Sequence, residues 1–156
     1  TRTGSLDEKK FITKEEYKEQ LRIDFTQMLG EKIKLRSRVE FANYKKGFEE
    51  GVLLFQDFYH QLNYHFKYNL RIAYFSTDSF DASIYAYEND VLYAFNTSAY
   101  FNKGSKYYLN LNYSIGKHLD FWFRSAMTYK PTYYQSTLEN ERKSLWELNF
   151  QLLFTY

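Results

Sequence analysis

The chain ends in the stretch WELNFQLLFTY, residues 146–156. Large apolar side chains occupy every second position from Trp146 to Tyr156, and most of the positions between them are polar. Only a β-strand places alternate residues on opposite faces, and a strand buried on both faces would read as a continuous apolar run. The stretch therefore predicts a strand with one apolar and one polar face. Such a strand of about ten residues is long enough to cross a bilayer when tilted, and a half-buried strand of a soluble barrel is the alternative.

The composition limits the classes of protein that remain. The 156 residues suffice for one domain with a sizeable core. Aromatic residues make up 22%, with 17 tyrosines, and tyrosine suits a boundary between apolar and aqueous phases. The mean hydropathy is −0.64, and even the longest apolar runs, such as Val52–Phe55, are short. Both observations exclude a transmembrane helix. They do not exclude a transmembrane barrel, because the lumen side of a barrel can be polar.

Charge and cysteine content exclude further kinds of site. A net charge of +2 gives no overall field that would indicate nucleic-acid binding. The absence of cysteine excludes disulfides, a thiolate nucleophile and cysteine metal ligands. No signal peptide is recognisable, so an exported protein would be represented here by a mature chain or a fragment.

The alternation of the last stretch recurs along the chain and predicts about nine strands. Residues 1–14 are polar and are expected to be an irregular lead-in, and residues 15–156 are expected to form the β-domain. The expected strands are 17–29, 33–41, 51–62, 66–74, 82–87, 91–101, 107–115, 119–129 and 146–156. The regular spacing of turns favours an all-β, antiparallel up-and-down sheet.

The polar face of these strands is too highly charged for a dry core. We expect it to line an aqueous lumen. The candidate lumen-lining residues are Arg22, Arg36, Arg38, Lys67, Arg71, Arg124, Asp120 and Glu147. Basic groups outnumber acidic ones on this face, which would favour anions in a pore. A ladder of cross-strand ion pairs that simply fills the lumen is the alternative.

The apolar face carries tyrosines that would suit the two membrane interfaces of a barrel. The candidate interface aromatics are Tyr17, Tyr68, Tyr74, Tyr107, Tyr113, Tyr129 and Tyr156. Ordinary packing between strands is the alternative.

Connection lengths give the expected sheet a direction. Short connections at 30–31, 63–65, 88–90 and 116–118 alternate with longer ones at 44–50, 76–81 and 132–142, and 102–104 is the exception. Transmembrane barrels have short periplasmic turns and longer outer loops, so the pattern predicts a transmembrane β-barrel with a periplasmic C-terminus. Because bacterial barrels have an even number of strands, the odd count leads us to expect the C-terminal part of a larger barrel.

Several stretches resemble one group of outer-membrane proteins. They are IYAYENDVLYAF at 84–95, AYFNKG at 99–104, KYYL at 106–109 and HLDFWFR at 118–124. They are similar to Bacteroidota outer-membrane proteins that carry helix-hairpin-helix repeats before a C-terminal barrel, and the similarity covers residues 79–129. It implies a location in the outer membrane and a longer parent chain. The repeats are absent here, so no nucleic-acid role is carried over, and the chain after Pro131 departs from the pattern.

The last residue adds a second resemblance. Tyr156 at the end of an alternating strand resembles the C-terminal signal by which outer-membrane barrels reach their assembly machinery. The resemblance implies that this machinery is a partner, through the C-terminal strand. The expected barrel would also contact outer-membrane lipid and, as a scaffold, other envelope proteins.

Residues that could carry chemistry are few. His60, His65 and His118 have no metal-ligand spacing and belong to no HExxH motif. A lipid hydrolase would need a histidine near a serine, and His118 with Ser114 or Ser125 is suggested by composition alone. We therefore predict no catalytic, cofactor-binding or metal-binding residues and no cofactor.

The sequence thus predicts a non-enzymatic outer-membrane β-barrel that acts as a pore or as the membrane scaffold of an envelope complex. A soluble lipocalin-like ligand carrier and an outer-membrane lipid-modifying enzyme are the alternatives.

Overall fold

The protein is all-β. The computed structural model describes residues 17–44, 48–131 and 143–156, without the Lys143 side chain. The expected lead-in at 1–14 and the whole of the loop at 132–142 lie outside these ranges. Nine strands are present in the described part of the chain: β1 (Lys18–Leu29), β2 (Ile33–Tyr44), β3 (Glu49–Gln61), β4 (Phe66–Thr77), β5 (Ile84–Glu88), β6 (Asn96–Tyr100), β7 (Lys103–Ile115), β8 (Leu119–Lys130) and β9 (Lys143–Phe154). None of the described residues belongs to a helix that could span a membrane.

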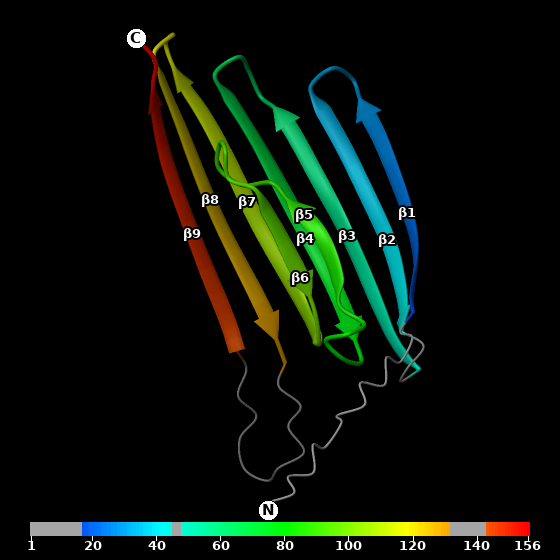
Figure 1. Ribbon diagram of the computed structural model, residues 1–156. Coiled ribbons are helices and arrows are strands. Elements are labelled where there is room, and N and C mark those ends of the chain that lie inside the picture. Colours follow the sequence, from blue (N-terminus) through cyan, green and yellow to red (C-terminus); the bar gives the residue numbers. More distant parts are fainter. Residues whose placement is uncertain (1–16, 45–47, 132–142) are drawn as a thin grey trace, which may run out of the picture.

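Seven of the strands form one antiparallel sheet in the order β1-β2-β3-β4-β7-β8-β9 (Figure 1). Each pair of neighbours follows directly in the chain except β4 and β7. Strands β1 and β9 each pair on one side only, so the sheet has two open edges and does not close upon itself within the described residues. The alternation therefore predicted these seven strands, although several of them extend a few residues beyond the expected bounds.

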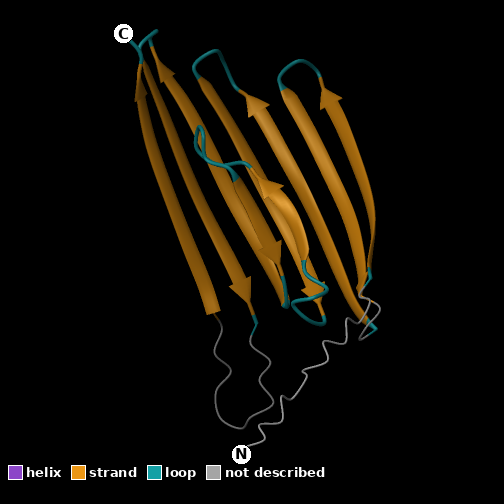
Figure 2. Cartoon of the chain, viewed as in Figure 1, coloured by secondary structure: helices purple, strands orange, loops and turns teal. Residues whose placement is uncertain are grey.

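The region between β4 and β7 departs from the expectation. Strands β5 and β6 pair with each other as a separate hairpin, which lies across one face of the sheet (Figure 2). The strand expected at 91–101 is shortened to Asn96–Tyr100, and Tyr93 adopts a positive φ of 64° that interrupts the extended backbone. The tight turn expected at 88–90 is consequently part of the hairpin tip and does not join two strands of the sheet.

Short turns gather at one end of the strands, that is, along one of the two sides of the sheet where the strands begin and end. They connect β1 to β2, β3 to β4 and β7 to β8, and the C-terminal end of β9 lies at the same edge (Figure 1). Gly30 and Gly116 have φ of 73° and 66° in two of these turns, a conformation that glycine adopts without a steric penalty. We call this the short-turn edge.

The hairpin distinguishes two faces of the sheet. We call the face that it covers the inner face, and the opposite one the outer face. The apolar core lies between hairpin and inner face, where Ile84, Ala86 and Tyr100 pack on sheet residues such as Leu53 and Phe75. Gly51 allows this close approach, because a Cβ atom there would lie 2.4 Å from the carbonyl oxygen of Ala82.

The outer face is apolar along the whole sheet, and it is exposed on every strand except β8, where it is half-buried. Phe150 and Leu148 expose 63% and 67% of their surface, and Ile72 in the central strand β4 exposes 51%. Other large apolar side chains exposed on this face are Leu21, Ile23, Phe25, Phe41, Leu54, Tyr74, Tyr107, Tyr113, Leu152 and Phe154. A contiguous apolar surface of this extent marks a face that meets another apolar phase or another protein.

Candidate functional site

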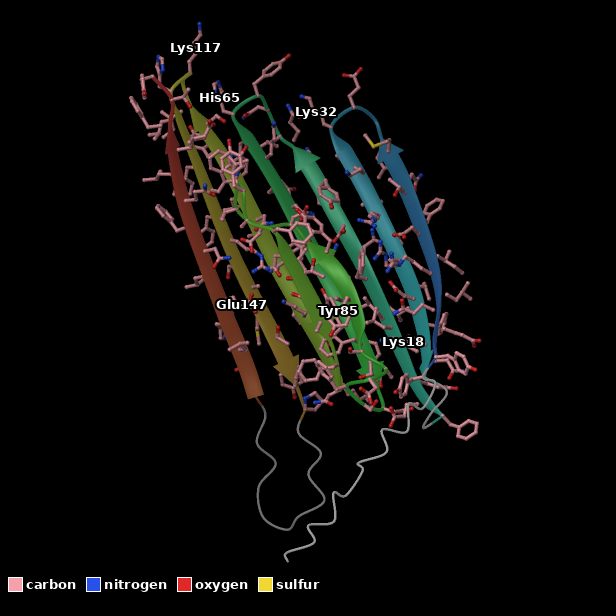
Figure 3. The ribbon with its side chains drawn as sticks, in the orientation of Figure 1. Lys18, Lys32, His65, Tyr85, Lys117 and Glu147 are labelled. Carbon is pink, nitrogen blue, oxygen red and sulfur yellow. The ribbon has the colours of Figure 1, made fainter. Side chains whose placement is uncertain are left out.

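The structure brings the eight predicted lumen-lining residues to the inner face. The strand registers give this common face. For example, Arg22 lies opposite Glu40, and Arg71 lies opposite Asp57. The eight are Arg22, Arg36, Arg38, Lys67, Arg71, Arg124, Asp120 and Glu147. The hairpin lies over the middle of this face (Figure 3). Six of the eight take part in three groups of ion pairs, and Lys67 and Asp120 lie outside these groups.

The first group lies on β1 and β2. The guanidinium of Arg22 donates two hydrogen bonds of 2.8 Å to the carboxylate of Glu40. The carboxylate of Asp24 accepts hydrogen bonds from Arg36 at 3.0 Å and from Arg38 at 2.9 Å. These are the cross-strand ion pairs of the ladder alternative, and they leave the arginines of this group paired.

The second group is a buried ion pair on β3 and β4. Arg71 donates hydrogen bonds of 2.6 and 2.7 Å to the two carboxylate oxygens of Asp57, and neither side chain is more than 1% exposed. A third donor of Arg71, Nη1, bonds to the carbonyl oxygen of Tyr87 in the hairpin at 2.7 Å. The guanidinium also stacks 3.8 Å from the ring centroid of Phe55. Arg71 thus connects the sheet to the hairpin while it neutralises Asp57.

The third group surrounds Glu88 at the end of β5. Its carboxylate lies 2.5 Å from Nη2 of Arg124 and 3.0 Å from Nζ of Lys106. It also accepts a hydrogen bond of 2.6 Å from the hydroxyl of Tyr100. Burial raises the pKa of Tyr100, and the adjacent Glu88 carboxylate raises it further, so this hydroxyl keeps its proton and remains a donor. Glu147 on β9 completes the group at 3.1 Å from Arg124.

The hairpin tip is held by amide groups. Nδ2 of Asn89 donates hydrogen bonds of 2.8 Å to the Tyr59 hydroxyl and to Oδ1 of Asn69. The carboxylate of Asp90 accepts hydrogen bonds from Asn149 at 2.8 Å and Asn96 at 2.9 Å. Burial alone would raise the pKa of Asp90, but these hydrogen bonds, helped by the backbone amide of Val91 and the charge of Arg124, lower it. Asp90 therefore stays ionised at neutral pH.

Buried charges of this kind persist only when they are paired, because desolvation costs several kcal/mol per ion. In the second and third groups each buried charge has a partner, and the partners lie on both the hairpin and the sheet. The arrangement fixes the position of the hairpin, and it cannot slide without leaving a buried charge unpaired.

Several of these residues were not predicted from the sequence. Glu88 and Asn89 stand in a turn-like ENDV segment, and Asp57 stands in a strand with apolar residues at both parities. The signal that could have identified Glu88 is the alternation of Ile84, Ala86 and Glu88. This alternation places a carboxylate on the buried side of a strand and requires a buried cation opposite.

The predicted interface tyrosines lie on the outer face or at its ends. Tyr68 and Tyr113 are near the short-turn ends of β4 and β7, and Tyr156 follows β9 at the same edge. Tyr74, Tyr107 and Tyr129 are near the opposite ends of β4, β7 and β8, where Tyr17 precedes β1. The tyrosines thus fall into two rows, with aliphatic residues such as Leu70 and Leu109 between them.

The three histidines are dispersed along the short-turn edge. Nδ1 of His65 lies 3.1 Å from the carbonyl oxygen of Ser114, and Nδ1 of His118 lies 2.8 Å from that of Thr155. The Ser114 hydroxyl donates its hydrogen bond to Asp120 and not to His118. Among the described residues, no three acidic or histidine side chains are grouped so that they could hold a metal ion.

Comparison with known proteins finds no match for this chain among family models, curated proteins or solved structures.

Proposed function

We propose that this chain forms part of the wall of an outer-membrane β-barrel, with the outer face against lipid and the inner face toward the lumen. The single observation that carries the proposal is the division of the sheet: one face is apolar, exposed on six of the seven strands and half-buried on β8, and the other holds nearly all the charges. In a soluble barrel carrier the aromatic face would surround the interior. Here the hairpin instead covers the charged face, which supports this face as the interior.

The open edges support a larger barrel. In the described part of the chain, strands β1 and β9 each pair along one side only, and an open sheet edge is not tolerated in the hydrocarbon region of a bilayer. Further strands from the parent chain would satisfy both edges. Because bacterial single-chain barrels have an even number of strands, an odd number of strands would join the seven.

The hairpin supports a filled scaffold over an open pore. It occupies space on the lumen side, and buried ion pairs fix it there. The arginines of the inner face already have carboxylate partners, so they are less available to select anions. A barrel partly filled by its own hairpin, which acts as a scaffold or a narrow channel, is the function that this geometry favours.

Substitution of two exposed residues tests the proposal. Ile72 on the outer face and Thr97 on the free side of the hairpin are both exposed to solvent in the isolated chain. A lipid-facing arginine near the middle of a bilayer costs about 2–4 kcal/mol. When the protein is exported in a Gram-negative host, Ile72→Arg is expected to reduce the amount in the outer-membrane fraction severalfold, and Thr97→Arg is the control that should leave it unchanged.

The opposite outcomes are equally definite. A wild-type chain that remains soluble without detergent would contradict the proposal. So would equal tolerance of both arginines, because a water-exposed sheet face accepts a single arginine as readily as the hairpin does.

A further inference from the structure

A pocket of about 380 Å³ lies on the inner face between the hairpin tip and the short-turn edge. Asn89 and Asp90 of the tip form one side, and Lys32 of the β1–β2 turn reaches the other. Its size falls within the range of small-molecule sites. None of the ion-pair groups described above fills it.

The floor of the pocket consists of amide side chains. Asn69 and Asn110 lie opposite each other on β4 and β7, and Asn112 lies two residues further along β7. An amide has a donor and an acceptor, which is the pattern that pairs with hydroxyl groups. Asn69 already accepts a hydrogen bond from Asn89 and donates one to the Phe58 carbonyl oxygen, and Asn112 donates one to the Phe121 carbonyl oxygen. Both side-chain polar atoms of Asn110 are buried and have no hydrogen-bond partner. Buried polar groups are nearly always paired, so Asn110 is the amide of the floor that lacks partners.

Two aromatic side chains supply apolar surface beside these amides. Tyr59 of β3 and Trp122 of β8 both line the pocket, and Trp122 lies opposite Asn112 in the strand register. Aromatic faces next to hydroxyl-binding amides suit a sugar ring, which has apolar C–H faces and a rim of hydroxyl groups.

Unpaired positive charge distinguishes this end of the inner face. Nζ of Lys34 lies 4.1 Å from the ring centroid of Tyr59, and Lys67 also lines the pocket. Within the described ranges, neither ammonium group has a carboxylate oxygen within 4.0 Å. The carboxylates of Glu31 and Asp90 also line the pocket, and that of Asp90 already accepts hydrogen bonds from Asn96 and Asn149. Three lysines, Lys32, Lys34 and Lys67, outnumber these two carboxylates. The pocket therefore favours a ligand that carries negative charge.

We propose that this pocket binds a short acidic saccharide, with hydroxyl groups on Asn110 and Asn112, a ring face on Trp122 and a carboxylate at Lys34 and Lys67. The proposal depends on inner-face residues alone, so it stands or falls independently of whether the outer face meets lipid.

Tryptophan fluorescence gives a direct test. The chain has two tryptophans, and Trp146 lies on the outer face with 62% of its surface exposed. Trp146→Phe therefore leaves Trp122 as the only tryptophan reporter. Titration of this protein in detergent with trigalacturonate is expected to change the emission of Trp122 saturably. The neutral trisaccharide maltotriose is expected to bind at least tenfold more weakly.

Variants assign the binding to the pocket. Lys34→Gln with Lys67→Gln, and separately Asn110→Leu or the milder Asn110→Ser, are expected to weaken trigalacturonate binding about tenfold. Lys117→Gln is the matched control, because Lys117 lies at the same edge (Figure 3) but does not line the pocket. Circular dichroism verifies that each variant keeps its β-structure, and equilibrium dialysis measures binding without relying on Trp122.

The proposal would be overturned by the absence of saturable binding by both methods, by equal affinity for maltotriose, or by equal weakening by Lys117→Gln. Full competition by inorganic phosphate at the same concentration would also overturn it, because the site would then recognise only an anion.

Discussion

At the scale of single residues, the inner face is organised by arginines that each serve two elements. Arg71 neutralises Asp57 and binds the Tyr87 carbonyl, and Arg124 binds Glu88 of the hairpin and Glu147 of β9. The planar guanidinium can do this because its donors point in several fixed directions. A lysine at either position would retain the charge but lose most of these contacts.

Removal of one partner of the buried pair tests this view. Arg71→Met leaves the Asp57 carboxylate buried and without its cation, which is expected to lower the free energy of unfolding by about 3–5 kcal/mol. Denaturant titration in detergent measures it. Arg36→Met is the matched control, since Arg36 and Asp24 are both about one-third exposed and Arg38 still binds Asp24. A loss below about 1 kcal/mol is expected there, and equal losses would contradict the assigned importance of burial.

Residue positions on the two faces could be predicted from the sequence, and their partners could not. Parity along a strand decides the face, so the alternation alone places Arg22, Arg71 and Arg124 correctly on one face. Whether a charge is paired depends on the register between strands and on the hairpin. The Asn69–Asn110 floor of the pocket depends on the register in the same way.

At the scale of elements, the hairpin is the feature that the alternation could not identify. Residues 91–101 place Val91, Tyr93 and Phe95 at one parity and so favour a strand, and alternation does not reveal which sheet a strand joins. The polar sequence around Glu88 belongs on the charged face, and it would be unfavourable against lipid. Connection length was an incomplete guide to the direction of the sheet. The short segment at 88–90 belongs to a hairpin tip and does not connect two strands of the sheet.

Neutralisation of Glu88 is expected to release this element. Glu88→Gln leaves Arg124 and Lys106 without the carboxylate that they share. Amide hydrogen exchange should then become at least tenfold faster across residues 84–100, while exchange in β3 and β8 stays close to the wild-type rate. Glu147→Gln is the control, because Glu147 contacts the same two cations but is one-third exposed and belongs to the sheet.

The contrary result would be uniform acceleration in both the hairpin and the sheet. That outcome would mean that β5–β6 does not move as a separate unit and that Glu88 stabilises the whole fold.

At the scale of the whole molecule, the central feature is the opposition of the two faces. The outer face has aliphatic residues between two rows of tyrosines, and the inner face has paired charges beneath a fixed hairpin. In the proposed barrel, lipid would cover the outer face, because water disfavours an apolar sheet face of this size. The charges of the inner face would point away from lipid, where they would be unfavourable.

The two tryptophans, on opposite faces, test this account most directly. In vesicles with brominated acyl chains, the Trp122→Phe variant reports only from Trp146 on the outer face, and Trp146→Phe reports only from Trp122 on the inner face. Bromine quenches tryptophan emission only at close range. We predict strong quenching of Trp146 and little quenching of Trp122. Equal quenching, or quenching of Trp122 alone, would contradict the assignment of the outer face to lipid.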